Sequence, residues 1–243
     1  MKRTLPALLA VAALFTACGD DDDVAATDEP VIDPGDGGRY EPVIDPADFV
    51  AEIDNPYMPF AVGTTWVYEG DGERVEVTVL DERREIIGVS TVVVRDTVTV
   101  DGELVEDTLD WFAQDADGNV WYFGEEVQNF ADGKLEDTDG SWEAGVDGAL
   151  PGIAMPADPE VGDAYRQEFW EGEAEDLGEI VRTGETVDVP FGPMDDVVVT
   201  KDWNPLDPEV IEEKHYARGV GLVLEEHVRG EPGRVELVEF RAG

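Results

Sequence analysis

The stretch Val92-Val-Val-Arg-Asp-Thr-Val-Thr-Val-Asp-Gly102 decides the fold class of this chain. One face of an extended strand over this stretch carries Val92, Val94, Val98 and Val100, opposite Val93, Arg95, Thr97 and Thr99. A period of two is typical of a β-strand. The stretch ends in Asp101-Gly102, and Asp-Gly between alternating runs is the strongest short-range signal for a hairpin. The stretch therefore predicts a strand followed by a tight turn.

The same pattern continues from about Phe49 to the C-terminus. Alternating runs lie at 75–79, 197–203, 220–228 and 235–240, and turn signals separate the runs at Asp71-Gly72, Asp117-Gly118, Asp132-Gly133 and Glu231-Pro-Gly233. Strands joined by tight turns pair antiparallel, and accumulated twist makes a long meander curl. We therefore expect an all-β domain over residues 46–243, a single curved antiparallel meander of about ten strands with a half-barrel or barrel-like shape.

The chain is strongly acidic. Its 243 residues include 59 Asp and Glu against 16 Lys and Arg, a formal net charge of −43. Nucleic-acid binding needs clustered cations, so nucleic acid is excluded as the main partner, and so is electrostatic attraction to an anionic membrane surface. The hydrophobic fraction of 42% with six Trp excludes a wholly disordered acidic chain. Scarce Lys beside abundant Asp and Glu is typical of a saline exterior, where salt screens self-repulsion.

Residues 1–17 predict a secretory signal peptide. Met1-Lys-Arg3 is a short cationic start, and the apolar run from Leu5 to Phe15 is too short to span a bilayer. Small residues precede Cys18, the only cysteine, in a pattern that resembles the lipobox of bacterial lipoproteins. This resemblance implies a mature chain that begins at a lipid-modified Cys18 and is anchored to the bacterial cell membrane, facing outside the cytoplasm. An ordinary cleaved signal peptide with an incidental cysteine is the alternative.

Residues 18–45 predict an extended linker between the anchor and the domain. Gly19 is followed by four aspartates, and the segment Glu29-Pro-Val-Ile-Asp-Pro-Gly-Asp36 returns almost unchanged as Glu41-Pro-Val-Ile-Asp-Pro-Ala-Asp48. A segment rich in Pro, Gly and Asp repels itself and stays extended. A spacer is the favoured interpretation, and binding of cations or of a partner protein by the repeats is the alternative.

Two predicted strands carry large apolar side chains on both faces, Leu109-Asp-Trp-Phe112 and Asn119-Val-Trp-Tyr-Phe123. Such strands lie between two layers or against an internal cavity. If a cavity is present, we expect its wall to include Trp111, Trp121, Phe123, Trp142 and Met155. A plain sandwich core is the alternative.

Residues 140–163 predict a long loop, because they contain no basic residue and show no clear period. Ile153-Ala-Met155 is the apolar centre of this segment. We expect these residues to plug one end of the sheet or to cover a cavity as a lid.

Motifs for catalysis are weak, and the sequence favours a protein without enzymatic activity. Ser90 and Ser141 are the only serines, and neither lies in Gly-x-Ser-x-Gly. His215 and His227 fall in adjacent predicted strands and could lie near each other, but two surface histidines are the simpler interpretation because no His-Glu-x-x-His motif is present. We therefore assign no catalytic residue, no metal ligand and no cofactor.

Acidic side chains leave two further functions open. Asp115-Ala-Asp117-Gly-Asn119 offers oxygen atoms at alternate positions, as calcium loops do, and would fit a calcium-dependent structural or adhesion module. A tight turn explains the same residues. Paired carboxylates could also act as the catalytic groups of an extracellular hydrolase. A chain this acidic always contains such pairs, so their presence alone does not indicate this activity.

Several segments resemble a group of uncharacterised secreted bacterial lipoproteins. They are Ile53-Asp-Asn-Pro-Tyr-Met-Pro59, Gly63-Thr-Thr-Trp-Val-Tyr68, Asp107-Thr-Leu-Asp-Trp-Phe-Ala-Gln-Asp115, Gly118-Asn-Val-Trp-Tyr-Phe-Gly124 and Lys214-His-Tyr-Ala-Arg-Gly-Val-Gly-Leu-Val223. The resemblance covers about Phe49 to Phe240. The last segment is also similar to the closing strands of lipoprotein-carrier-like half-barrels, which hold acyl chains, and this similarity implies no catalytic residue.

The sequence thus favours an envelope-anchored lipoprotein whose β-domain binds a small apolar or amphipathic ligand. Its expected partners are the membrane, through the lipid anchor, and that ligand. The oligomeric state leaves no signal in the sequence.

Overall fold

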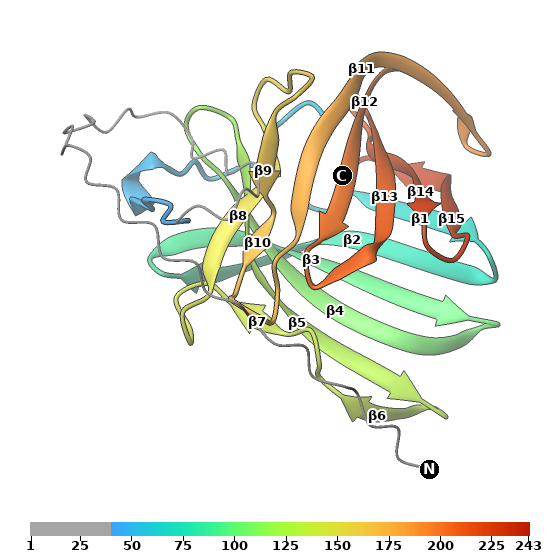
Figure 1. Ribbon diagram of the computed structural model, residues 1–243, viewed down its shortest axis with the longest axis horizontal. Helices are drawn as coiled ribbons and strands as arrows, with labels where there is room; N and C mark the ends of the chain where they lie inside the picture. Colours follow the sequence, from blue (N-terminus) through green and yellow to red (C-terminus); the bar gives the residue numbers. More distant parts are fainter. Residues whose placement is uncertain (1–39) are drawn as a thin grey trace, which may run out of the picture.

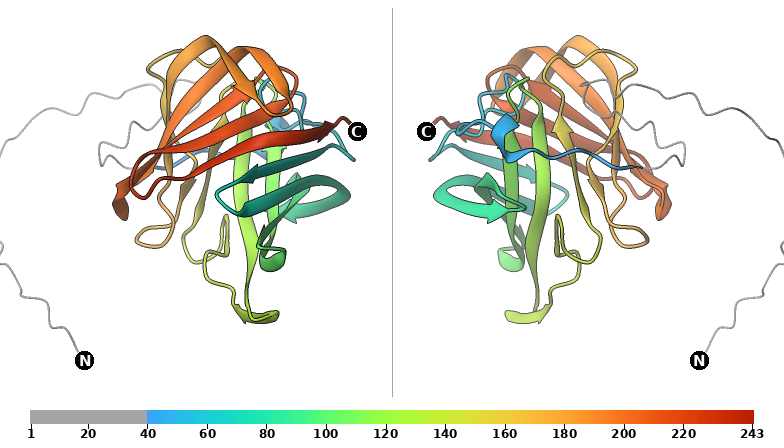
Figure 2. Two further views of the ribbon diagram at one scale, coloured as in Figure 1. Left: turned by 90° about the vertical axis from the view of Figure 1, so that its right-hand side faces the viewer. Right: turned by 90° about the vertical axis from the view of Figure 1, so that its left-hand side faces the viewer.

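The computed structural model describes residues 40–243, which form one curved antiparallel sheet (Figures 1 and 2). The predicted all-β class and curved sheet are confirmed. In this part of the chain a 3-10 turn, η1 (Pro46–Asp48), is the only helical element. The strands are β1 (Thr65–Gly70), β2 (Glu73–Ile86), β3 (Val89–Val100), β4 (Glu103–Gln114), β5 (Val120–Ala131), β6 (Lys134–Asp137), β7 (Trp142–Glu143), β8 (Leu150–Met155), β9 (Ala164–Arg166), β10 (Glu168–Phe169), β11 (Leu177–Val189), β12 (Gly192–Asn204), β13 (Asp207–Ala217), β14 (Gly221–Arg229) and β15 (Arg234–Arg241).

The number of strands is larger than expected. Fifteen strands are present among residues 40–243, where about ten were predicted. The excess comes from short strands such as β7 and β10, each of two residues. A strand of two residues cannot show a period, so alternation in the sequence does not reveal it.

The Asp-Gly turns join the long strands as predicted. At Asp71-Gly72, between β1 and β2, φ is 50° and 88°, and Asp101-Gly102 between β3 and β4 has nearly the same values, 52° and 82°. Two consecutive residues with positive φ are the mark of the type I′ turn, whose twist matches that of the strands it connects. Asp132-Gly133 repeats this geometry between β5 and β6.

The two ends of the sheet are brought together by one extended stretch of chain. The hydrogen-bonded order runs β10-β8-β5-β4-β3-β2-β1-β15-β14-β13-β12-β11-β9, so β10 and β9 are the end strands. In the sequence these two strands are separated by Gln167 alone, with β9 paired to β11 and β10 paired to β8. The sheet therefore wraps around an interior that strands from both halves of the chain face.

The segment 140–163 is not the loop that the sequence predicts. It contains β7 and β8, both of which pair with β5, so Ile153-Ala-Met155 is part of the sheet rather than a lid or a plug. Gly152 explains why this strand fits there. A Cβ at this position would lie 2.4 Å from the backbone of Gln167, so only glycine lets the two ends of the sheet approach this closely.

The N-terminal described residues pack on the sheet. Phe49 places its ring 5.6 Å from that of Phe123 and 6.3 Å from that of Trp121. Tyr40, which composition places in the linker, is buried and donates a hydrogen bond to the Pro151 carbonyl (2.8 Å). The predicted signal peptide, Cys18 and the linker up to residue 39 lie outside the described residues.

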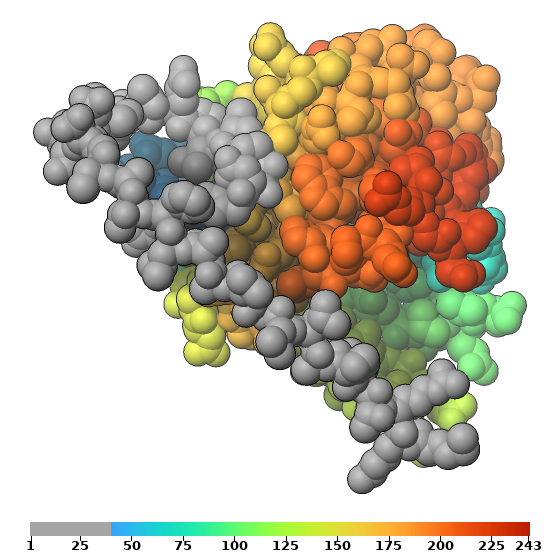
Figure 3. All heavy atoms as spheres, viewed as in Figure 1, coloured from blue at the N-terminus to red at the C-terminus, as the bar shows by residue number. Residues whose placement is uncertain are grey.

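In the space-filling view, strands β11–β14 form one continuous part of the surface, coloured orange to red (Figure 3). Within residues 40–243 there is no helix whose length and hydropathy would let it cross a membrane.

Candidate functional site

The interior of the sheet contains two adjoining cavities. One has a volume of about 570 Å³ and is lined by many carboxyl groups; we call it the acidic cavity. The other, of about 430 Å³, is lined mainly by aliphatic and aromatic side chains; we call it the apolar cavity. Five residues line both cavities: Met58, Asp110, Phe112, Lys214 and Tyr216. The two spaces therefore meet at a shared wall.

Strands β4 and β5 bring two acids face to face in the acidic cavity. Asp110 on β4 is the cross-strand partner of Glu125 on β5, and both side chains line the cavity. The Tyr122 hydroxyl donates a hydrogen bond of 2.8 Å to Asp110. Glu168 of β10 joins these acids from the end of the sheet. Like charges directly opposite each other destabilise a sheet, so their presence here calls for compensation.

These buried acids hold protons tightly. Burial raises the pKa of Asp110 to about 7, although the hydrogen bond from Tyr122 works against that rise. Burial, followed by the nearby charge of Asp110, raises the pKa of Glu125 to about 8. Burial and its interaction with Asp176 also raise the pKa of Glu168. Near neutral pH the acidic cavity therefore carries partly protonated carboxyl groups, which a positively charged ligand would ionise.

Lys214 supplies a positive charge on the opposite wall. Its Nζ lies 3.5 Å from Asp202 Oδ2, 3.6 Å from Glu225 Oε2 and 3.7 Å from Glu212 Oε2. Burial favours the neutral amine, but the surrounding acids outweigh it and hold the pKa of Lys214 well above its usual value. Lys214 is therefore a fixed ammonium between three carboxylates.

Aromatic rings build the wall of the apolar cavity. The ring of Phe60 lies 5.8 Å from Trp66 and 5.0 Å from Phe112, in edge-to-face contacts. The aliphatic part of the wall comes from Val75, Val77, Val94, Val98, Leu222 and Val235. Four acids also line this cavity: Glu73, Asp96, Asp110 and Glu225. Burial, followed by the charge of Asp110, raises the pKa of Asp96 well above the usual value.

The five side chains predicted to line a cavity are buried, but none of them lines either of these two cavities. Trp111 lies under the guanidinium of Arg84 at 3.9 Å, and Trp121 and Phe123 pack against Phe49. Trp142 contacts the ring of Tyr122 edge to face at 5.3 Å, and Met155 is fully buried. The aromatic residues that do line the acidic cavity from these strands are their neighbours, Phe112 and Tyr122.

The proposed calcium loop is a hydrogen-bonded turn. Asp115 Oδ1 accepts hydrogen bonds from the backbone N–H groups of Asp117 (3.1 Å) and Asn119 (2.8 Å). Asp115 Oδ2 accepts from the Asn119 amide (2.9 Å) and the Trp121 indole (2.8 Å). Both carboxylate oxygens are therefore engaged in holding the turn, as expected for an Asx turn.

The two histidines do not face each other. His215 on β13 is opposite Leu224, whereas His227 on β14 is opposite Glu212. His227 shares the face of its cross-strand partner Glu212, which lines the acidic cavity. Successive residues of a strand point to opposite faces, so His215, three positions after Glu212, lies on the other face of the sheet. The interpretation as surface histidines is wrong for His215, which is 8% exposed.

No family model matches the chain, and no curated protein matches it. Two solved structures match it. One is provisionally described as an exported protein with a YmcC-like fold from Bacteroides fragilis; it is 16% identical, with a TM-score of 0.45, and the match covers 76% of this chain and 99% of that one. The other is provisionally described as a lipoprotein from Parabacteroides distasonis; it is 15% identical, with a TM-score of 0.42 over 77% of this chain and 99% of that one.

Proposed function

We propose that this protein is a lipid-anchored envelope protein that binds an amphipathic ligand with a positively charged head. The anchor is proposed from the sequence around Cys18 alone. The ligand class is proposed from the two adjoining cavities, one acidic and one apolar, and this pairing is the observation that carries the proposal. An apolar ligand without charge would form no ion pair with the acids of the acidic cavity.

The acidic cavity favours a cation because burial makes the ionisation of its carboxyl groups costly. An ammonium group beside Asp110 and Glu125 would replace their protons and form charge-assisted hydrogen bonds. Tyr122 and Trp203 line the same cavity, and aromatic faces also attract cations. An alkyl chain attached to that ammonium would extend past Phe112, in the shared wall, into the apolar cavity.

Mass spectrometry of small molecules that co-purify with the natively expressed protein tests this function. The wild-type protein should carry a cationic amphiphile, and the Glu125→Gln variant should carry less of it. Glu85→Gln is the matched control, because Glu85 is an exposed acid outside both cavities. Recovery of only neutral or anionic lipids would contradict the proposed ligand class.

An extracellular hydrolase that uses two carboxyl groups is the second candidate. It is favoured by Glu168, whose raised pKa suits a general acid, and by the neighbouring Asp176 in the same cavity. Turnover of nitrophenyl glycosides or esters that is lost in Glu168→Gln and kept in Glu85→Gln would favour this function over simple binding. No turnover above that of the Glu168→Gln variant would remove it.

A further inference from the structure

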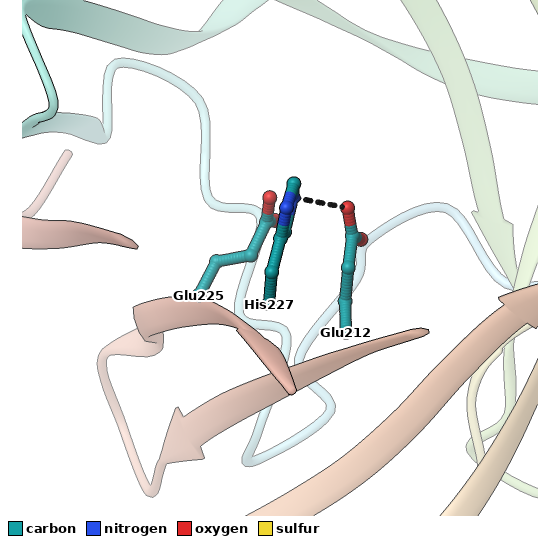
Figure 4. A group of neighbouring side chains, drawn as sticks. All are labelled: Glu212, Glu225 and His227. Atoms are coloured by element: carbon teal, nitrogen blue, oxygen red, sulfur yellow. Dashed lines mark ion pairs between the residues drawn. The ribbon is translucent and has the colours of Figure 1, made fainter. Parts of the chain in front are cut away.

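Glu212, Glu225 and His227 form a group on one face of β13 and β14 (Figure 4). The register of the two strands creates this group. Glu212 is the cross-strand partner of His227, and Glu225 precedes His227 by two residues, so all three side chains share a face. Their potential ligand atoms all lie within 4.8 Å of one another. Figure 4 shows the imidazole between the two carboxylates.

The imidazole of His227 is held with one particular nitrogen toward the acids. Its Nδ1 lies 2.8 Å from the carbonyl oxygen of Glu231. A carbonyl only accepts hydrogen bonds, so Nδ1 carries a hydrogen and Nε2 is the nitrogen that faces the acids. Nε2 lies 3.0 Å from Glu212 Oε1. At this distance either a proton on Nε2 or a bound metal ion would join the imidazole to the carboxylate, and metal-binding histidines use the same carbonyl contact to orient the ring.

The turn between β14 and β15 fixes the ring in that position. The backbone N–H of His227 donates a hydrogen bond of 2.8 Å to the Gly233 carbonyl. A Cβ on Gly233 would lie 3.0 Å from Nδ1 of the imidazole. The chain therefore lies flat against the ring, and the absence of a side chain at Gly233 makes this approach possible.

The charges around the group leave an excess of negative charge. Asp202 on β12 is the cross-strand partner of Glu212 and is only 5% exposed. Its Oδ1 accepts no hydrogen bond within residues 40–243. Lys214 contacts Asp202, Glu212 and Glu225, so one ammonium faces three carboxylates. A divalent cation would balance this excess.

His215 provides the contrast on the other face. It also lies near two acids, Glu213 and Glu226, but Arg182 pairs with Glu213 at 2.6 Å and Arg234 pairs with Glu226. These two ion pairs are already neutral, so this second group has no excess charge to attract a metal. His215 therefore serves as an internal control for His227.

We propose that Glu212, Glu225 and His227 bind a first-row divalent cation of the Zn²⁺ type. One imidazole nitrogen and two carboxylates suit Zn²⁺ better than Ca²⁺, which takes oxygen ligands only. Three protein ligands leave a coordination position open to water or to a ligand group from the cavities. Glu212 lines the acidic cavity and Glu225 lines the apolar cavity, so the site lies in the walls of these cavities, but metal binding there does not require the amphiphile that we propose.

Calorimetric titration of the full-length, detergent-purified protein with ZnCl₂ tests the site. We expect one equivalent to bind, with affinity falling at least tenfold in His227→Gln and in Glu212→Gln. His215→Gln is the matched control and should bind Zn²⁺ as the wild type does. Gly233→Ala should also weaken binding about tenfold, because the added methyl group displaces the ring that the ligand set needs.

Nitrogen-15 NMR of the wild-type imidazoles tests the same claim without any variant. Zn²⁺ should shift Nε2 of His227 and leave both nitrogens of His215 unchanged. The site is contradicted by a response of His215 in place of His227, by unchanged Zn²⁺ affinity in a folded His227→Gln variant, or by no binding up to millimolar Zn²⁺.

Discussion

Asp110 on β4 lies directly opposite Glu125 on β5, and both carboxyl groups face the acidic cavity. Burial raises the pKa of Asp110 to about 7 and that of Glu125 to about 8. Both acids therefore bind a proton more tightly in the folded chain than in the unfolded one. The free energy of unfolding therefore depends on the protonation state of these two acids.

The free energy of unfolding should fall as pH rises from about 5 to 9. Between the ordinary pKa of a carboxyl group, near ~4, and the folded values of about 7 and 8, the folded state binds more protons than the unfolded state, so stability decreases with pH. We expect a loss of a few kcal/mol, measured by urea unfolding at each pH. The Asp110→Asn, Glu125→Gln double variant should show a much flatter profile, and Glu85→Gln should keep the wild-type slope. A wild-type profile that rises across this interval would contradict the burial of these acids.

Replacing Lys214 by Met should destabilise the fold by about 2–4 kcal/mol at pH 7, because it leaves Asp202, Glu212 and Glu225 without their shared ammonium. Lys201→Met is the matched control. Lys201 forms a more exposed ion pair with Glu179 at 3.0 Å, and such pairs contribute ~0–1 kcal/mol. Denaturant unfolding of both variants measures the difference. Equal losses in the two would show that Lys214 has no special role.

Replacing Gly152 by Ala should cost more than the usual glycine substitution in a strand. The new Cβ would meet the backbone of Arg166 and Gln167 at 2.4–2.5 Å, so the ends of the sheet must separate. We expect a loss of at least ~3 kcal/mol and faster hydrogen exchange in β8 to β10. Gly148→Ala is the control, because no atom lies within 4 Å of its Cβ and only the strain of a φ of 92° remains.

Replacing Asp115 by Ala should destabilise the protein by about 2–3 kcal/mol, since four donors lose their acceptor. The side chain of Asp117 is exposed, so Asp117→Ala should change the melting temperature little. Thermal unfolding with and without calcium separates the two interpretations of this turn. A melting temperature that rises with calcium in the wild type and not in Asp115→Ala would restore the calcium loop.

The regular part of this fold could be predicted from the sequence. Alternation in the stretch around Val94 and the Asp-Gly pairs identify the long hairpins, because both signals are local. The joining of the two ends through Gln167 depends on strands far apart in the sequence and too short to show a period. The segment around Ile153 was missed for the same reason, because β5 and β10 supply the partners that make it a strand.

The cavity residues could be predicted less well. The sequence identifies two strands with aromatic side chains on both faces, but it does not say which face is concave. Trp111 and Phe112 differ by one position and therefore point to opposite sides. Phe49 packs against Trp121 and Phe123, so the face of the sheet that carries these two side chains is covered by a segment distant in the sequence. The acids around Lys214 gave no signal at all, because three adjacent strands contribute them.

The central claim is that the interior binds a cationic amphiphile, and a matched pair of probes tests it most directly. Dodecylamine and dodecanoate have the same tail and opposite charge, and each can be titrated calorimetrically into the full-length protein at pH 7. We predict saturable binding of dodecylamine, with protons released by Asp110 and Glu125 and therefore a heat that depends on the ionisation enthalpy of the buffer. Dodecanoate should bind at least tenfold more weakly. Equal binding of the two probes, or binding of neither, would contradict the account.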